Sequence, residues 1–242
     1  MRPVVWYISG HGFGHASRQI EIINAVRARR PGLPIVVRTG ASPWIFDLTL
    51  RSPVEVQHVE CDTGVAQIDS LRLDEAETLR RAGEFYANFG RRVADEAVFL
   101  RDAGASLVVA DIPPLAIAAA REAGVPSVAI GNFTWDWIYE AYEPERAGLP
   151  HLVPAIREAC IGASQYVRLP MWGGFEMAPD DRTVDLPLVA RRSSRPRGET
   201  RASLGLPADR RLVLLSFGGH GLENLDAAAL RGLAPEYLVI VT

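Results

Sequence analysis

The 242-residue chain contains no lysine, and all 26 of its basic residues are arginine. This absence excludes sites that depend on a lysine side chain, such as the P-loop of nucleoside triphosphatases, Schiff-base enzymes and cofactors anchored on a lysine. Any phosphate that the protein binds must therefore be held by arginine, by backbone amides or by a helix N-terminus.

Cysteine and excess charge are also scarce. The two cysteines, Cys61 and Cys160, lie far apart and form no CxxC pair, so the sequence indicates neither a disulfide framework nor a structural zinc site and favours the cytoplasm. The formal net charge of −3 and the pI near 6.0 provide no overall positive field. We therefore expect no nucleic-acid partner and favour small-molecule chemistry.

Long hydrophobic runs are missing as well. Apolar stretches stay well short of the ~20 residues that a transmembrane helix needs, and glycines and histidines interrupt the N-terminal run before it could act as a signal peptide. The sequence thus predicts no transmembrane segment. The composition, with 48% hydrophobic and 23% charged residues, is that of an ordinary globular protein.

Short apolar runs alternate with amphipathic segments along most of the chain. We expect strands at residues 4–9, 35–39, 54–59, 107–110, 127–130 and 166–169, and helices at 16–30, 74–103, 115–124 and 152–161. Apolar strands that alternate with helices predict an α/β fold with a doubly wound, Rossmann-like parallel sheet covered on both faces. Ligands of such sheets bind outside the carboxyl ends of the strands, here after Ser9, Ala110 and Ile130.

The C-terminal part predicts a second domain. Residues 191–210 begin with an arginine-rich run that we interpret as an interdomain linker, with a phosphate or nucleic-acid patch as the alternative. Residues 211–242 then read as the first βαβ unit of another Rossmann-like domain, after a first domain at residues 1–190. Because one such unit cannot bury both faces of its sheet, we expect that further sequence completes this domain.

A glycine loop follows the first expected strand, with the sequence GHGFGHASR at residues 10–18. It is not the dinucleotide fingerprint GxGxxG, which disfavours nicotinamide binding. Gly12 and Gly14 let the backbone approach a ligand closely, and the following helix N-terminus favours a phosphate or diphosphate. His15 lies in the first helical turn, where the helix dipole favours a neutral imidazole suited to a general base, although it could instead only cap the turn.

Other candidate residues follow later strands. Asp111 ends one strand and could orient His15, or could simply cap the next helix. Asn132, Trp135 and Asp136 combine aromatic and polar groups that suit a sugar ring, and Asp62 could face the same cleft, although buried packing aromatics are the commoner case. His11 and His15 are four residues apart, but the glycines between them make a continuous helix and a metal site unlikely to form.

A second glycine loop repeats the strand–glycine–helix pattern near the C-terminus. It contains Gly218, Gly219 and His220. Two such loops on opposite sides of an interdomain cleft could together bind a diphosphate.

The order of these motifs resembles the two-domain glycosyltransferases of the GT-B fold. The run from Gly12 to Arg18 is similar to the G-x-G-H element after their first strand, in which the histidine activates the acceptor, and the resemblance implies that Asp111 supports this base and that Arg18 belongs to the phosphate-binding element. The runs GHGFGHASR, CDTGVAQIDSLRLD, LVVADIPP, GNFTWDWIYEAY, VRLP, DLPLVARR and SFGG more specifically resemble the glycosyltransferase-like N-terminal region of L-arabinokinases and its free-standing bacterial relatives. No phosphate loop of a sugar kinase is present.

The resemblance implies a metal-independent glycosyltransferase that needs no cofactor. It would transfer a sugar from a nucleotide-diphosphate sugar to a hydroxyl of a sugar or glycoside acceptor, and a downstream donor-binding part would be missing from this chain. A nucleotide-sugar hydrolase of the same fold and a non-catalytic sugar- or nucleotide-binding domain are the alternatives.

Overall fold

The computed structural model describes residues 1–145, 147–217, 226–233 and 236–241, which form two compact units. The first unit consists of residues 1–66 and 74–190, and the second of residues 67–73 and 191–242. Within the described residues, no helix is long and apolar enough to cross a membrane.

A seven-stranded parallel sheet forms the centre of the first unit, with the strand order β3-β2-β1-β6-β7-β8-β9. The order runs outward from β1 in both directions, so the chain reverses direction beside β1 and β6. This arrangement confirms the predicted doubly wound α/β fold. The strands are β1 (Val4–Ile8), β2 (Ile35–Thr39), β3 (Glu55–His58), β6 (Leu107–Asp111), β7 (Ser127–Gly131), β8 (Gln165–Arg168) and β9 (Thr183–Asp185).

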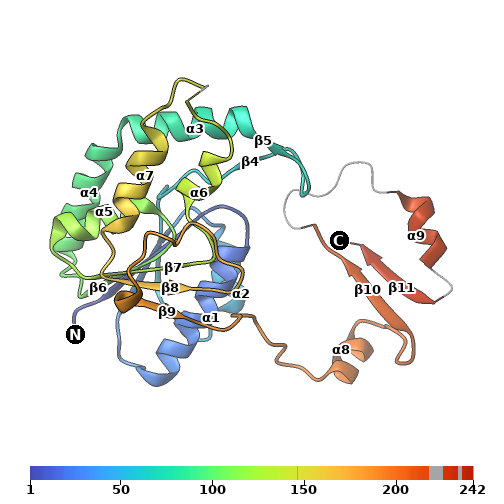
Figure 1. The fold of residues 1–242 in the computed structure, drawn as a ribbon. Helices are drawn as coiled ribbons and strands as arrows, with labels where there is room; N and C mark the ends of the chain where they lie inside the picture. The colour runs from blue at the N-terminus through green and yellow to red at the C-terminus, as the bar shows by residue number, and fades with distance from the viewer. Residues whose placement is uncertain (146, 218–225, 234–235, 242) are drawn as a thin grey trace. The chain divides into compact units, whose positions relative to one another are not determined.

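Helices cover both faces of this sheet (Figure 1). On one face lie α1 (Gly14–Arg29) and α2 (Pro43–Thr49). On the other face lie α3 (Glu75–Ala87), α4 (Phe89–Asp102), α5 (Pro114–Ala123), α6 (Trp135–Glu140) and α7 (Leu152–Ile161). β4 (Ala66–Gln67) and β5 (Leu73–Asp74) pair as a separate two-stranded sheet, and a 3₁₀ turn, η1 (Asp180–Arg182), precedes β9.

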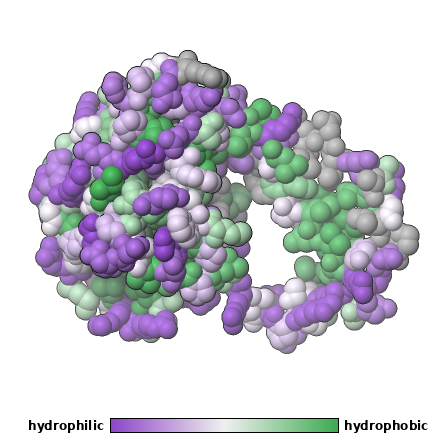
Figure 2. All heavy atoms as spheres, viewed as in Figure 1, coloured by the Kyte–Doolittle hydropathy of each residue, from purple (hydrophilic) through white to green (hydrophobic). Residues whose placement is uncertain are grey.

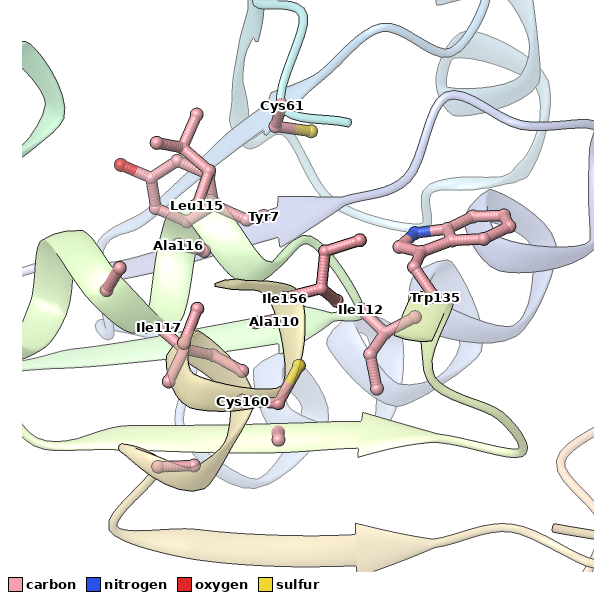
Figure 3. Packing of buried hydrophobic residues seen from close by; sticks show 14 of the residues in the cluster. Tyr7, Cys61, Ala110, Ile112, Leu115, Ala116, Ile117, Trp135, Ile156 and Cys160 are labelled. Atoms are coloured by element: carbon pink, nitrogen blue, oxygen red, sulfur yellow. The ribbon is translucent and has the colours of Figure 1, made fainter. Parts of the chain in front are cut away.

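The core consists of two layers, one on each face of the sheet, and β1 contributes to both. Val5 and Tyr7 point into the layer under α3 to α7, whereas Trp6 and Ile8 point into the layer under α1 and α2. All residues of β1 are buried, because successive side chains of a strand face opposite sides and both sides are covered. Figure 3 shows part of the first layer, with side chains from β1, β6, α5, α6 and α7.

The expected helix over residues 74–103 is wrong, because the structure contains two helices there. α3 ends at Ala87 and α4 begins at Phe89, with Asn88 between them at φ −111° and ψ 18°. Asparagine and the nearby Gly90 are both poor helix formers, which accounts for the break at this place. The Asp74 side chain caps the start of α3, since it accepts a hydrogen bond from the Glu77 N–H at 2.9 Å.

The second unit contains two parallel strands, β10 (Arg211–Leu215) and β11 (Tyr237–Val241), with α9 (Ala227–Leu233) between them in sequence. This confirms the predicted βαβ unit. The stretch expected as a linker contains a short helix, α8 (Arg197–Ser203), and its Arg201 is buried and donates hydrogen bonds to the carbonyls of Pro207 and Arg210. Apolar side chains gather over β10 and β11 (Figure 2).

A buried ion pair ties α4 to the sheet. Arg38 on β2 donates to both carboxylate oxygens of Glu96 on α4, at 2.9 and 2.6 Å, and the Tyr7 hydroxyl donates to the same carboxylate at 2.6 Å. Burial, followed by the charge of Glu96, raises the pKa of Tyr7, so its hydroxyl stays protonated as a donor. The Arg38 guanidinium also stacks 3.8 Å from the ring centre of Phe99.

We expect the substitution Glu96→Gln to lower the free energy of unfolding by about 3 kcal/mol, because it leaves the Arg38 charge buried without its partner. Urea unfolding measures this change. The neighbouring Asp95→Asn is the matched control, since Asp95 is exposed and lies 3.8 Å from an exposed Arg91. Equal losses in the two variants would contradict a stabilising role for the buried pair.

Candidate functional site

The carboxyl ends of β1, β6 and β7 meet at one edge of the sheet, beside the point where the strand order reverses. Ile8 at the end of β1 pairs with Asp111 at the end of β6, and the Ser9 N–H donates to the Asp111 carbonyl at 2.8 Å. Asn132 follows β7 directly. Ligands of open α/β sheets bind at such a position, so this edge is the candidate site.

Three side chains of α1 contact the Asp111 carboxylate. His15 Nδ1 lies 2.8 Å from Oδ1, Arg18 donates from Nε to Oδ2 at 2.6 Å and from Nη2 to Oδ1 at 2.5 Å, and Gln19 Nε2 donates to Oδ2 at 2.6 Å. Residues three and four positions apart lie on one face of a helix, which is how α1 presents all three side chains to one carboxylate. Asp111 itself is completely buried.

Asp111 is ionised over the whole physiological pH range. Burial raises its pKa, but the charges of His15 and Arg18 and their hydrogen bonds outweigh burial and lower the pKa to about 2. A carboxylate can only accept hydrogen bonds, so His15 Nδ1 must carry the proton that it shares with Asp111. When the imidazole is neutral, the other ring nitrogen, Nε2, is therefore the acceptor, as a general base requires. Arg18 Nη2 lies 3.0 Å from His15 Nδ1 and donates to the same carboxylate oxygen of Asp111.

Two further residues hold the donors of α1 in place. Asn132 accepts a hydrogen bond from Arg18 Nη1 at 2.5 Å, and Gln19 Oε1 accepts one from Trp6 Nε1 at 2.8 Å. The predicted residues His15, Asp111, Arg18 and Asn132 are therefore brought together. Gln19 was not among the residues predicted from the sequence, although its spacing of four residues from His15 places it on the same helix face.

A loop after β3 brings Asp62 to the same edge. Cys61 donates from Sγ to the Ile8 carbonyl at 3.3 Å, and Asp62 Oδ2 accepts a hydrogen bond from Trp135 Nε1 at 2.8 Å. Burial raises the pKa of Asp62, while a hydrogen bond from Ser9 and the charge of His15 act in the opposite direction. Asp62 thus lies near His15, and the structure brings it together with Trp135.

Aromatic rings surround the His15 imidazole. The ring centre of Phe133 lies 5.5 Å from that of His15 in an edge-to-face arrangement, and the ring centre of Trp135 lies 6.3 Å away. The His11 ring contacts Trp135 edge to face at 5.8 Å. His11 packs so closely against residue 64 that glycine is required there, since a Cβ at this position would lie 2.6 Å from the His11 Cβ.

The glycine loop ends in the N-terminus of α1. Gly12 has φ +63°, which favours glycine, and Phe13 is the N-cap residue without a side-chain cap. Gly14 begins the helix, and no acidic residue lies in the first turn. The first-turn amides and the positive end of the helix dipole are the features that bind anions in other proteins.

The remaining predicted residues lie elsewhere. Asp136 turns away toward α7, where its Oδ2 accepts a hydrogen bond from Arg157 Nε at 3.0 Å, while Oδ1 is buried and has no partner in the structure. The loop residues Gly218, Gly219 and His220 lie outside the described residues. Across the described part of the chain, no group of His, Cys, Asp and Glu side chains could hold a metal ion. Both cysteines are buried and form no disulfide.

Comparisons with known proteins place this geometry in a known fold. No family model matches the chain. L-arabinokinase of Arabidopsis thaliana is 36% identical over 219 residues, which is 88% of this chain and 20% of the relative, so the chain spans about a fifth of the relative's length. A UDP-glucosyltransferase from Polygonum tinctorium, capable of glucosylating indoxyl, superposes with a TM-score of 0.56 at 12% identity, covering 100% of this chain and 72% of the other. The calicheamicin glycosyltransferase CalG4 gives 0.56 at 16% identity, with 100% and 66% covered.

The chain has the GT-B glycosyltransferase fold. The predicted resemblance to the GT-B glycosyltransferases and to L-arabinokinase is confirmed. In this GT-B fold, His15 follows β1 and Asp111 ends β6. These are the two strands beside which the strand order of the sheet reverses.

The low pKa of Asp111 predicts a pH-dependent stability. Because its folded pKa of about 2 lies below the usual 3.8, ionised Asp111 stabilises the fold above about pH 4, and this contribution is lost as the pH falls through about 2. We expect the difference in free energy of unfolding between the wild type and Asp111→Asn to shrink by about 2 kcal/mol from pH 5 to pH 2. Urea unfolding at several pH values measures it, and a difference that does not change with pH would contradict the ionised state of Asp111.

Proposed function

We propose that the protein takes part in sugar transfer from a nucleotide-diphosphate sugar to an acceptor hydroxyl, with His15 as the general base. The observation that carries the proposal is the contact between His15 and the ionised Asp111 carboxylate at the ligand-binding edge of a GT-B sheet. The similarity to glycosyltransferases of that fold supports the general role.

In the proposed reaction, Nε2 of His15 accepts the proton of the acceptor hydroxyl. Asp111 holds the ring by its Nδ1 proton and stabilises the imidazolium that forms. The acceptor oxygen then forms a bond to the anomeric carbon while the bond from that carbon to the diphosphate oxygen breaks, and the nucleoside diphosphate leaves with the bonding electrons. The configuration at the anomeric carbon is inverted. Arg18 and Gln19 act as positioning residues, since they contact Asp111.

The diphosphate would be bound by backbone amides and needs no metal ion in this proposal. The N–H groups of residues 12–14, at the positive end of α1, would stabilise the developing charge on the leaving group. Gly218, Gly219 and His220 would contribute from the second glycine loop. Arg18 remains a candidate for an additional phosphate contact, although its guanidinium already donates to Asp111 and Asn132.

Asp62, Asn132 and Trp135 are proposed to bind a sugar or glycoside acceptor, whereas the predicted Asp136 is instead held by Arg157. The hydrogen bond between Asp62 and Trp135 and the ring contact of Trp135 with His15 support this proposal for Asp62 and Trp135. We also propose that the protein acts in the cytoplasm, because two buried cysteines that form no disulfide suit a reducing compartment.

A second candidate is a non-catalytic domain that binds a sugar or a nucleotide sugar. The similarity to L-arabinokinase favours it, because this chain corresponds to about a fifth of that protein and a kinase can carry a sugar-binding domain of another fold. A nucleotide-sugar hydrolase, with water in place of the acceptor, uses the same base. The assay below separates the three functions.

We expect His15→Ala to lower kcat/KM for transfer about 10²- to 10⁴-fold, as is usual for loss of a general base. The full protein is incubated with a panel of nucleotide sugars and sugar acceptors, and the release of nucleoside diphosphate is measured with and without acceptor. His151→Ala is the matched control, because His151 is exposed at the start of α7 and distant in sequence from the glycine loop.

The outcomes distinguish the candidates. Release that requires an acceptor supports transfer, and release without an acceptor identifies a hydrolase. Binding of nucleotide sugar without any turnover identifies a binding domain. Equal rates for His15→Ala and the wild type would contradict the role of His15 as the base.

A further inference from the structure

A cavity of about 250 Å³ lies beside Asp62, between the loop after β3 and the helices α3 and α4. Its lining includes Asp62 and Phe85, which are buried, and the more exposed side chains of Glu60, Arg81, Glu84 and Arg92. All of these residues belong to the first unit. The cavity is therefore a feature of one compact body.

Asp62 connects this cavity to the candidate site. Its Oδ2 accepts a hydrogen bond from Trp135 Nε1, and the charge of His15 acts on its pKa. Asp62 is 8% exposed, so it is almost fully removed from solvent and yet forms part of the cavity wall.

The other polar groups of the cavity are held by exchangeable contacts. Arg92 donates from Nη2 to Glu60 at 3.1 Å, and its guanidinium lies 4.2 Å from the ring centre of Phe85. Arg81 donates from Nε to Glu77 at 2.7 Å, outside the cavity lining. Such partly exposed ion pairs have little net free energy, so a ligand hydroxyl can replace one partner at low cost.

The charges of the lining nearly cancel. Two arginines face three carboxyl groups. A lining of this kind offers both donors and acceptors but no net field for an anion. It would also be costly to cover with a flat aromatic molecule, because guanidinium and carboxylate groups would lose water without gaining hydrogen bonds.

We propose that this cavity binds the acceptor of the transfer reaction, and that the acceptor is a neutral, polyhydroxylated molecule the size of one monosaccharide. The volume lies below the ~300–1,000 Å³ typical of pockets for drug-sized ligands, which matches a single sugar ring. That the ligand is the acceptor rests on the proposed function, whereas the class of ligand rests on the cavity alone. Asp62 is the group that accepts a hydrogen bond from the sugar.

Isothermal titration calorimetry on the full protein tests the proposal. The probes are neutral pentoses and hexoses, the phosphates of the same sugars, and a simple phenol as an aromatic acceptor. We expect a neutral sugar to bind more tightly than its phosphate and than the phenol, and we expect Asp62→Asn and Arg92→Ala each to weaken this binding at least about tenfold, as the loss of a hydrogen bond to a charged group does.

Arg91→Ala is the matched control for Arg92→Ala. Arg91 is the preceding residue of α4, is largely exposed and does not line the cavity. Urea unfolding of each variant establishes that it is folded, and the surface position of Arg92 keeps the test decisive if Asp62→Asn does not fold.

Two results would overturn the inference. One is a folded wild type that binds no neutral sugar or prefers the phosphate or the phenol, and the other is equal affinity of Arg92→Ala and Arg91→Ala for the sugar. The proposed function fails separately. Sugar binding that depends on Arg92 without any turnover of nucleotide sugars retains the ligand class and rejects transfer, whereas transfer to phenols alone retains transfer and rejects the ligand class.

Discussion

The burial of one carboxylate determines the organisation of the candidate site. An ionised Asp111 without solvent would be very costly, and four hydrogen-bond contacts from α1 offset that cost. Arg18 supplies the opposite charge, Gln19 supplies a neutral donor, and both are fixed by partners of their own on β1 and after β7. His15 is thus one member of a network whose geometry is set by the need to stabilise Asp111.

The same network explains why the position of His15 is well defined. Its ring is held at Nδ1 by Asp111 and is flanked by Phe133 and Trp135, and Trp135 is in turn fixed by its hydrogen bond to Asp62. The two acidic residues therefore have different surroundings. The pKa of Asp111 is lowered by charged partners, whereas that of Asp62 is raised by burial.

The sequence predicted those parts of the structure that depend on local pattern. The strands at residues 4–9, 35–39 and 107–110 could be located because apolar runs ended by glycine or aspartate mark them, and His15 and Asp111 could be selected because each follows such a strand. The break at Asn88 and the three-residue strand β9 were missed, since neither interrupts the hydrophobic pattern strongly. The contact of Asp62 with Trp135 joins residues 73 positions apart, and only the fold brings them together.

The spacing of His15, Arg18 and Gln19 on α1 has a consequence for how such sequences can diverge. Each residue of an α-helix turns the chain by about 100°. One residue inserted or deleted between His15 and Arg18 would rotate the His15 side chain off the face that Arg18 and Gln19 share. Substitutions in the loop can be accommodated where glycine geometry is not required, but the distance along the helix from His15 to Gln19 cannot change while all of these side chains still reach Asp111. Among related chains, length should therefore be more strictly maintained in this segment than amino-acid identity.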